Sequence, residues 1–248
     1  MIINIARKEL KSLFASPMGW VVLALLQFVF GTFFLIGMDQ YFQTMSGMIR
    51  PEERLGVTQF VGQNVFSIAS FVMLFAVPLL SMRLISDERR QQTLTFLFSA
   101  PLSLTDIVVG KFLGLVGFLS IVLLFMGAML MSLGLWSEID YGYILANILG
   151  LWLLVASFSA LGIYVSSLTH QPVVAGIITF VLLFALLILD RFFAGDPSST
   201  INYLSLMRHF EAFSRGLLDT RDLVYFFLFI VTFLTLTVRR LDADRLRG

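Results

Sequence analysis

Long apolar stretches dominate this sequence and limit the folds that it can adopt. A helix needs about 20 mostly apolar residues to cross the hydrocarbon core of a bilayer. The sequence predicts six such helices, of which the last is short. Their predicted bounds are 18–38, 65–82, 107–135, 143–168, 172–189 and 223–238. We therefore expect an all-α, polytopic membrane protein that forms one transmembrane domain over residues 1–248.

Charge is scarce in the sequence. Hydrophobic residues make up 58% of the chain and charged residues 13%, against about 25% charged residues in soluble domains, so a bilayer is the expected main solvent. The formal net charge of +1 gives no indication of nucleic acid as a partner. The chain has no cysteine, which excludes disulfides, thiolate nucleophiles and cysteine-based metal sites.

Basic residues near the ends of the predicted spans indicate the orientation of the chain. With six spans both termini share one side of the membrane, and that side has eleven lysines and arginines against six on the other. The eleven are Arg7, Lys8, Lys11, Arg83, Arg89, Arg90, Lys111, Arg239, Arg240, Arg245 and Arg247. Because cytoplasmic loops carry the excess of basic residues, we expect both termini in the cytoplasm.

Residues 1–16 have the pattern of an amphipathic helix that lies on the membrane surface. At 100° per residue its apolar side chains fall within one arc, with Ile5 as the exception, while Arg7, Lys8 and Lys11 fall opposite. A basic face opposite an apolar face suits the anionic cytoplasmic leaflet. The alternative is a basic flank that only sets the topology of the first span.

The most unusual polar segment, residues 86–101, reads SDERRQQTLTFLFSAP and lies between the second and third predicted spans. Ser86 would cap a helix whose first turn carries acidic residues, where the helix dipole favours them. Apolar residues at helical spacing follow, and Pro101 would end the helix. Ser103 and Asp106 would then cap the start of the third span. The pattern predicts a short charged helix beneath the membrane; a solvated loop with topology-setting charges is the alternative.

The segment between the fifth and sixth predicted spans has the pattern of a short external helix. Apolar residues recur there at helical spacing, and Glu211 and Arg215 are placed for an i,i+4 ion pair. Gly216 is suited to end this helix, and Asp219 to cap the last span. We expect a short amphipathic helix on the external side of the membrane.

Small residues recur at four-residue spacing within the predicted spans. Gly110 and Gly114 form such a pair at the start of the third span, and Gly162 and Ser166 form another in the fourth. Small side chains let helix backbones approach closely. We expect most of these pairs to serve packing within the subunit.

The interiors of the predicted spans contain no Asp, Glu, Lys, Arg or His, and the sequence has no phosphate-binding loop. Ion-coupled transporters usually need ionisable or unwound sites at mid-membrane depth, so this alternative is disfavoured. A membrane hydrolase is also disfavoured, because the two histidines lie on opposite sides and no catalytic motif accompanies them. The energy that couples any transport would therefore have to enter from outside the spans. A non-transporting scaffold stays open as an alternative.

Residues 85–114 resemble the cytoplasmic segment of ABC type-2 exporter permeases. In that family a cluster of acidic and basic residues precedes a Gly-Thr-Leu-Glu-like core, a proline, and a Gly-Lys that enters the third span. The matching residues are Glu88, Arg89, Thr93, Leu94, Pro101, Gly110 and Lys111, whereas Gln92 and Thr95 replace the usual glycine and acid. The opening ARKELKSLFASPMGWV resembles the start of permeases from gliding-motility and nitrous-oxide-reductase maturation systems.

The resemblance implies a division of labour between chains. This chain would be a six-helix permease in a bacterial inner membrane, without enzymatic activity and without a bound cofactor or metal. It would join a second permease, identical or different, and two ATPase subunits that use ATP and Mg²⁺; an accessory periplasmic or membrane protein is a further partner that the resemblance allows. The residues that would couple it to the ATPase are Asp87, Glu88, Arg89, Arg90, Thr93, Leu94 and Leu97, beside Arg7, Lys8 and Lys11 of the surface helix.

Overall fold

The computed structural model describes residues 1–46, 56–92, 103–135, 137–193 and 205–246, without the side chains of 189–193. Over these residues the chain is helical and has no strand. The helices are α1 (Ile2–Ala15), α2 (Pro17–Met45), α3 (Val57–Ser81), α4 (Arg83–Arg90), α6 (Leu104–Met131), α7 (Tyr141–Leu168), α8 (Pro172–Phe193), α9 (Leu206–Ser214) and α10 (Thr220–Arg245), with a 3₁₀ turn at Ser132–Leu135. The all-α class predicted from the sequence is confirmed for this part of the chain.

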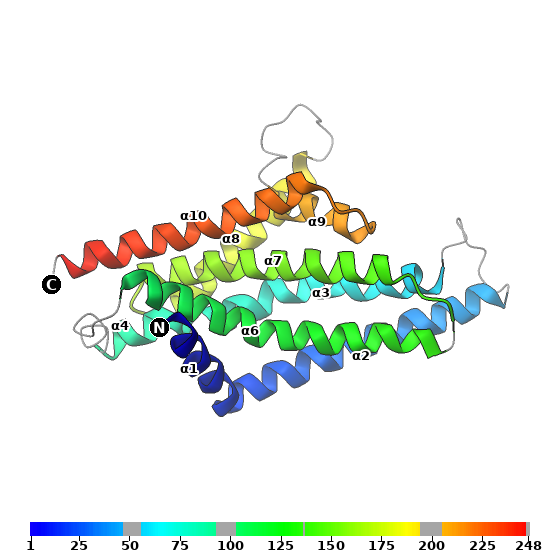
Figure 1. The fold of residues 1–248 in the computed structure, drawn as a ribbon, viewed down its shortest axis with the longest axis horizontal. Coiled ribbons are helices and arrows are strands. Elements are labelled where there is room, and N and C mark those ends of the chain that lie inside the picture. The colour runs from blue at the N-terminus through cyan, green and yellow to red at the C-terminus, as the bar shows by residue number, and fades with distance from the viewer. Residues whose placement is uncertain (47–55, 93–102, 136, 194–204, 247–248) are drawn as a thin grey trace.

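Helix α7 is the centre of the bundle. It packs against α3, α6, α8, α9 and α10, whereas α2 packs on α3 and α6 at the opposite side from α10 (Figure 1). The long helices run roughly along one axis, and both termini and α4 lie at the same end of it (Figure 1). We call this end of the bundle the terminal end. The shared position of the termini agrees with an even number of membrane crossings.

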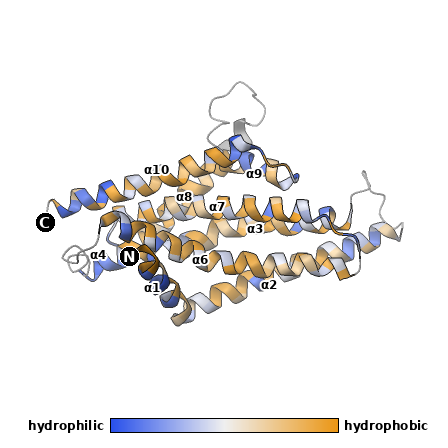
Figure 2. Ribbon diagram, viewed as in Figure 1, coloured by the Kyte–Doolittle hydropathy of each residue, from blue (hydrophilic) through white to orange (hydrophobic). Residues whose placement is uncertain are grey.

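Five helical segments in the described residues are long and apolar enough to cross a membrane, which supports a polytopic membrane protein. They are Pro17–Met45, Val57–Arg90, Leu104–Leu135, Tyr141–Leu168 and Thr220–Arg245. The predicted fifth span corresponds to α8, whose apolar stretch with described side chains, Pro172–Ile188, is shorter. The apolar colouring follows the middle of the bundle, and polar residues gather on α4, on one side of α1 and near the end of α10 (Figure 2). The sixth crossing stays a prediction.

Several helix ends differ from the predicted spans because helical structure continues where the apolar stretch stops. Helix α2 extends to Met45, α3 begins at Val57, and α10 extends through Arg245. Two of the predicted caps are present: the Ser103 side chain accepts a hydrogen bond from the Asp106 backbone N–H, and Asp219 accepts one from the N–H of Arg221.

Helix α1 packs across the start of α6, and the first pair of small residues makes this approach possible. A Cβ atom on Gly110 would lie 2.7 Å from Cβ of Ile5, and one on Gly114 would lie 2.6 Å from Cβ of Glu9. These distances are far below ordinary van der Waals contact. Ile5, the exception to the predicted apolar arc, is therefore the side chain that contacts Gly110, whereas Ile3 on the arc is exposed. The apolar side chains of α1 are divided between α6 and the outside of the bundle.

Helix α9 is the short helix predicted between the fifth and sixth spans. It packs along α7, where Phe213 covers Gly150, and its first residue, Leu206, lines a small apolar space shared with α3, α7 and α8. The chain turns at Gly216, whose φ of +78° is a conformation that glycine adopts readily. Helix α9 is thus part of the bundle and not a free external segment.

Candidate functional site

Helix α4 extends α3 beyond a break at Met82, and its residues 86–90 belong to the predicted coupling segment. The predicted cap at Ser86 is wrong: α4 begins at Arg83, and Ser86 is a buried residue whose hydroxyl donates to the carbonyl of Met82. The chain stays helical there because the apolar surface of α3 continues through Leu84 and Ile85, both buried. Residues Thr93, Leu94 and Leu97 of the predicted coupling set lie outside the described residues.

The break between α3 and α4 is bridged by one hydroxyl group from α7. Oγ of Ser166 accepts hydrogen bonds from the backbone N–H groups of Ile85, at 3.2 Å, and Ser86, at 3.1 Å. The same hydroxyl donates to the carbonyl of Met82 at 2.9 Å. One turn earlier on α7, Gly162 lies against Ser81 with no room for a side chain. The second pair of small residues therefore forms the surface that holds the α3–α4 junction.

Replacing Ser166 with alanine is expected to destabilise this junction. The change removes the acceptor of two buried N–H groups, and an unsatisfied buried donor costs about 1–3 kcal/mol. We expect a lower melting temperature of the protein in nanodiscs and a cleavage rate by protease that rises within residues 83–92. Ser167→Ala is the matched control, because within the described parts of the chain the buried Ser167 hydroxyl makes only a local hydrogen bond, to the carbonyl of Tyr164. Equal melting temperatures for the two variants would contradict this role of Ser166.

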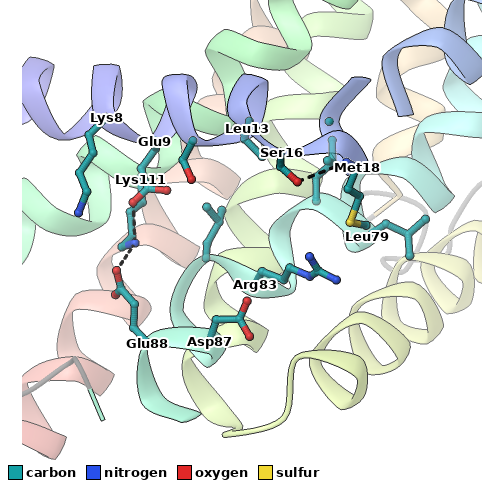
Figure 3. A pocket seen from close by; sticks show the side chains of 14 residues that line it. Lys8, Glu9, Leu13, Ser16, Met18, Leu79, Arg83, Asp87, Glu88 and Lys111 are labelled. Atoms are coloured by element: carbon teal, nitrogen blue, oxygen red, sulfur yellow. Dashed lines mark hydrogen bonds and ion pairs between the residues drawn. The ribbon is translucent and has the colours of Figure 1, made fainter. Parts of the chain in front are cut away.

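Lys111 joins three helices at the terminal end of the bundle. Its Nζ lies 2.9 Å from Oε1 of Glu9 on α1 and 2.7 Å from Oε1 of Glu88 on α4 (Figure 3). The Lys111 side chain is only 4% exposed, against 15% for Glu9 and 23% for Glu88. Charge-assisted hydrogen bonds of this kind are about twice as strong as neutral ones. We call Glu9, Lys111 and Glu88 the ion triad.

The ion triad forms one wall of an open cavity between α1 and α4. The cavity has a volume of about 340 Å³ and is also bounded by the start of α2 and the end of α3. Arg83 and Asp87 project into it from one face of α4, and Lys8 from α1 (Figure 3). Opposite charges thus line the space, and α1 and α4 are connected across it through Lys111.

The other side of α4 is connected to the end of α10. The guanidinium of Arg89 donates to Oδ2 of Asp244, and Nη2 of Arg240 lies 3.6 Å from the other oxygen of that carboxylate. The Arg89 side chain is 7% exposed and that of Asp244 21%. Within the described residues the Nε atoms of Arg89 and Arg240 are buried and have no acceptor. Asp244 is the carboxylate that compensates both guanidinium charges.

The predicted coupling residues are placed on different surfaces. Asp87 and Glu88 face the cavity and the ion triad, Arg89 faces Asp244, and Arg90 is exposed. On α1, the predicted residues Arg7, Lys8 and Lys11 are exposed, and only Lys8 lines the cavity.

Sequence reasoning did not find the ion partners Glu9 and Asp244, and it considered Lys111 only as a topology-setting cation and a motif residue. One local signal was available for Glu9, since it is the single acid between the basic residues of the first helix. Nothing in the sequence around Asp244 indicates its partner. Among the described residues, no group of three or more His, Asp or Glu side chains is arranged to hold a metal ion.

Comparison with known proteins gives one result that covers nearly the whole chain. No curated protein matches the sequence. A family model described as "ABC-2 family transporter protein" matches residues 3–244. This range includes every described helix, except for the first residue of α1 and the last residue of α10. The match thus extends over α1, the ion triad and the end of α10, and the chain belongs to the ABC-2 family of transporter proteins.

Proposed function

We propose that this chain is the permease subunit of an ABC exporter and that α4 couples it to a separate ATPase subunit. Proteins of the ABC-2 family are membrane subunits that generally have no catalytic activity and work with an ABC ATPase. The absence of a phosphate-binding loop from the sequence supports this assignment. In the proposed assembly two ATPase subunits bind and hydrolyse ATP with Mg²⁺, and a second permease completes the pathway across a bacterial inner membrane.

The observation that carries the proposal is the ion triad. A coupling element must transmit movement to the spans, and α4 is connected to α6 and α1 through one buried cation, Lys111. The triad also lies at the terminal end of the bundle, which the distribution of basic residues predicts to be cytoplasmic. Closure of the ATPase dimer would displace α4, and the shared cation would make α1 and α6 move with it. Such a connected group of helices is a two-state element that can be biased from one end.

The ion triad does not favour the ion-coupled alternative. Lys111 is the eighth residue of α6 and lies near the end of the helix, whereas ion-coupled sites in transporters lie near mid-membrane depth. A proton or sodium gradient that drives transport without ATP would support that alternative. The gliding-motility and nitrous-oxide-reductase subgroup remains a proposal that rests on the opening of the sequence.

The proposal is tested by reversing charge on the coupling helix. Glu88→Lys places a second cation beside Lys111 and is expected to reduce permease-stimulated ATPase activity about tenfold or more, because repulsion replaces the contact that connects α4 to α6. Leu94→Asp is expected to weaken copurification of the ATPase, because this residue belongs to the predicted apolar edge of the segment. The measurements are ATPase copurification and ATPase activity in nanodiscs.

The control for this experiment is the same charge reversal at the other end of the bundle. Glu211→Lys changes an exposed residue of α9 whose only described ion pair is with Arg215, four residues later. This variant should retain ATPase association and stimulation. Unchanged copurification and unchanged ATPase activity in both Glu88→Lys and Leu94→Asp would refute the coupling function of this segment.

A further inference from the structure

We infer that Asp244 is a positioning residue that holds the coupling helix α4 on a different face from the ion triad. The inference rests on the proposed function of α4 and adds to it a connection to the last helix of the chain. It makes the final turns of α10 a part of the coupling apparatus and not only the end of a membrane span.

The first observation is that neighbouring residues of α4 are bound in different directions. Glu88 contacts Lys111 of α6, and Arg89 contacts Asp244 of α10. Successive residues of an α-helix point about 100° apart, so the two contacts hold different faces of α4. Helix α4 cannot rotate about its own axis without breaking at least one of them. Its orientation is therefore fixed jointly by α6 and α10.

The second observation is that the end of α10 is built to present Asp244. The apolar part predicted as the sixth span stops at Val238, yet the helix continues to Arg245. Thr237 and Leu241 are buried at 0% and 2% exposure, and they anchor the charged extension on the bundle. Arg240, one turn before Asp244, lies near the same carboxylate. The extension is therefore a packed part of the bundle that reaches α4.

The third observation is the limited exposure of the pair. The Arg89 side chain is 7% exposed, so its charge is largely withdrawn from water and depends on Asp244 for compensation. A buried ion pair is costly to break from one side, because the remaining charge stays buried without its partner. The contact thus favours one position of α4 relative to α10. Because breaking the contact is costly, the end of α10 should move together with α4.

The geometry is tested first, without any ATPase. The chain has no cysteine, so cross-linking of two introduced cysteines reports only the distance between these two positions. Arg89→Cys combined with Asp244→Cys should be joined by a short bifunctional maleimide in native membranes. Arg89→Cys combined with Asp242→Cys is the control, because Asp242 is exposed and two residues away. Equal cross-linking of the two pairs, or none in either, would overturn the inference whatever the function of α4.

The functional role is tested by a conservative change with a matched control. Asp244→Asn should leave membrane insertion and ATPase copurification intact but reduce permease-stimulated ATPase activity about tenfold. Asp242→Asn removes the same charge from the same helix and should retain the activity of the unchanged protein. The exchange Arg89→Asp with Asp244→Arg restores an ion pair of reversed polarity and should recover most of the activity lost in Arg89→Asp alone. If each substitution only disturbed the local packing, the second substitution would not recover activity.

The outcomes separate this inference from the proposed function. If Glu88→Lys uncouples the ATPase while Asp244→Asn behaves as Asp242→Asn, α4 is the coupling helix and the inference about Asp244 is wrong. If Glu88→Lys and Leu94→Asp both leave coupling unchanged while the cysteine pair still cross-links, the contact exists but the proposed function fails. Loss of activity in the charge exchange as severe as in Arg89→Asp alone would also overturn the role of Asp244.

Discussion

Replacing Lys111 with methionine is expected to cause the largest loss of stability of any single change at the terminal end of the bundle. The change removes the cation shared by Glu9 and Glu88 and leaves two partly buried carboxylates side by side. Breaking a buried ion pair from one side costs about 3–5 kcal/mol, and since these carboxylates keep some exposure we expect about 3 kcal/mol. For a chain of this length that lowers the melting temperature by about 6–12 °C, measured in nanodiscs at one heating rate.

A triple variant distinguishes loss of the ion triad from a packing defect. Lys111→Met combined with Glu9→Gln and Glu88→Gln leaves no uncompensated charge, and neutral replacement of a whole buried ion group is often close to neutral in stability. The triple variant should therefore recover most of the lost melting temperature. Lys11→Met changes an exposed lysine of α1 and should keep the melting temperature of the unchanged protein. A triple variant as unstable as Lys111→Met would show that the charge of Lys111 is not what matters.

Replacing Gly114 with leucine is expected to detach α1 from α6. A Cβ atom at this position would lie 2.6 Å from Cβ of Glu9 and 3.0 Å from the carbonyl oxygen of Ala6, so the backbone of α1 has to move. Overpacking of this kind costs about 1–3 kcal/mol. The shift would also withdraw Glu9 from Lys111. In an otherwise cysteine-free chain carrying Ile5→Cys, maleimide labelling of that cysteine should accelerate about tenfold.

The control for this experiment is the same change on an open surface. A Cβ atom on Gly31 of α2 would meet nothing within 4 Å, so Gly31→Leu adds the side chain without a clash. Leucine has a higher helix propensity than glycine by about 1 kcal/mol, and both variants share this gain. Gly31→Leu should leave the labelling of Ile5→Cys unchanged. Equal labelling rates in the two leucine variants would mean that the packing of α1 on α6 does not depend on the missing side chain at Gly114.

Local patterns in the sequence predicted those features that depend on neighbouring residues. The caps at Ser103 and Asp219 and the turn at Gly216 each require one residue type at one backbone conformation, and all three are present. The sequence also predicted that some helix would approach closely at Gly110 and Gly114, because small residues at this spacing indicate a helix crossing. The sequence did not indicate that α1 would be the helix that occupies it.

The contacts of the candidate site could not be predicted because they join distant parts of the chain. Lys111 is far in sequence from Glu9, and Arg89 is farther from Asp244; no local pattern relates such residues. At Ser86, by contrast, a local pattern was present but predicted the wrong structure. Its capping preference is real, but the apolar surface around Leu84 and Ile85 and the hydroxyl of Ser166 hold the chain in a helix there. Tertiary packing overrides the local preference.

The backbone at Met82 keeps α-helical angles, so α3 and α4 form one helical segment, Val57–Arg90, and would act as the two arms of a lever. Helix α3 has 25 residues and α4 has 8, so at 1.5 Å per residue the arms are about 37 Å and about 12 Å long. Ser166 on α7 holds the junction at both sides of the break and serves as the fulcrum. For stiff arms, a displacement of about 1 Å at the tip of α4 becomes about 3 Å at the far end of α3. A small push at the terminal end would thus be amplified at the opposite end of the bundle.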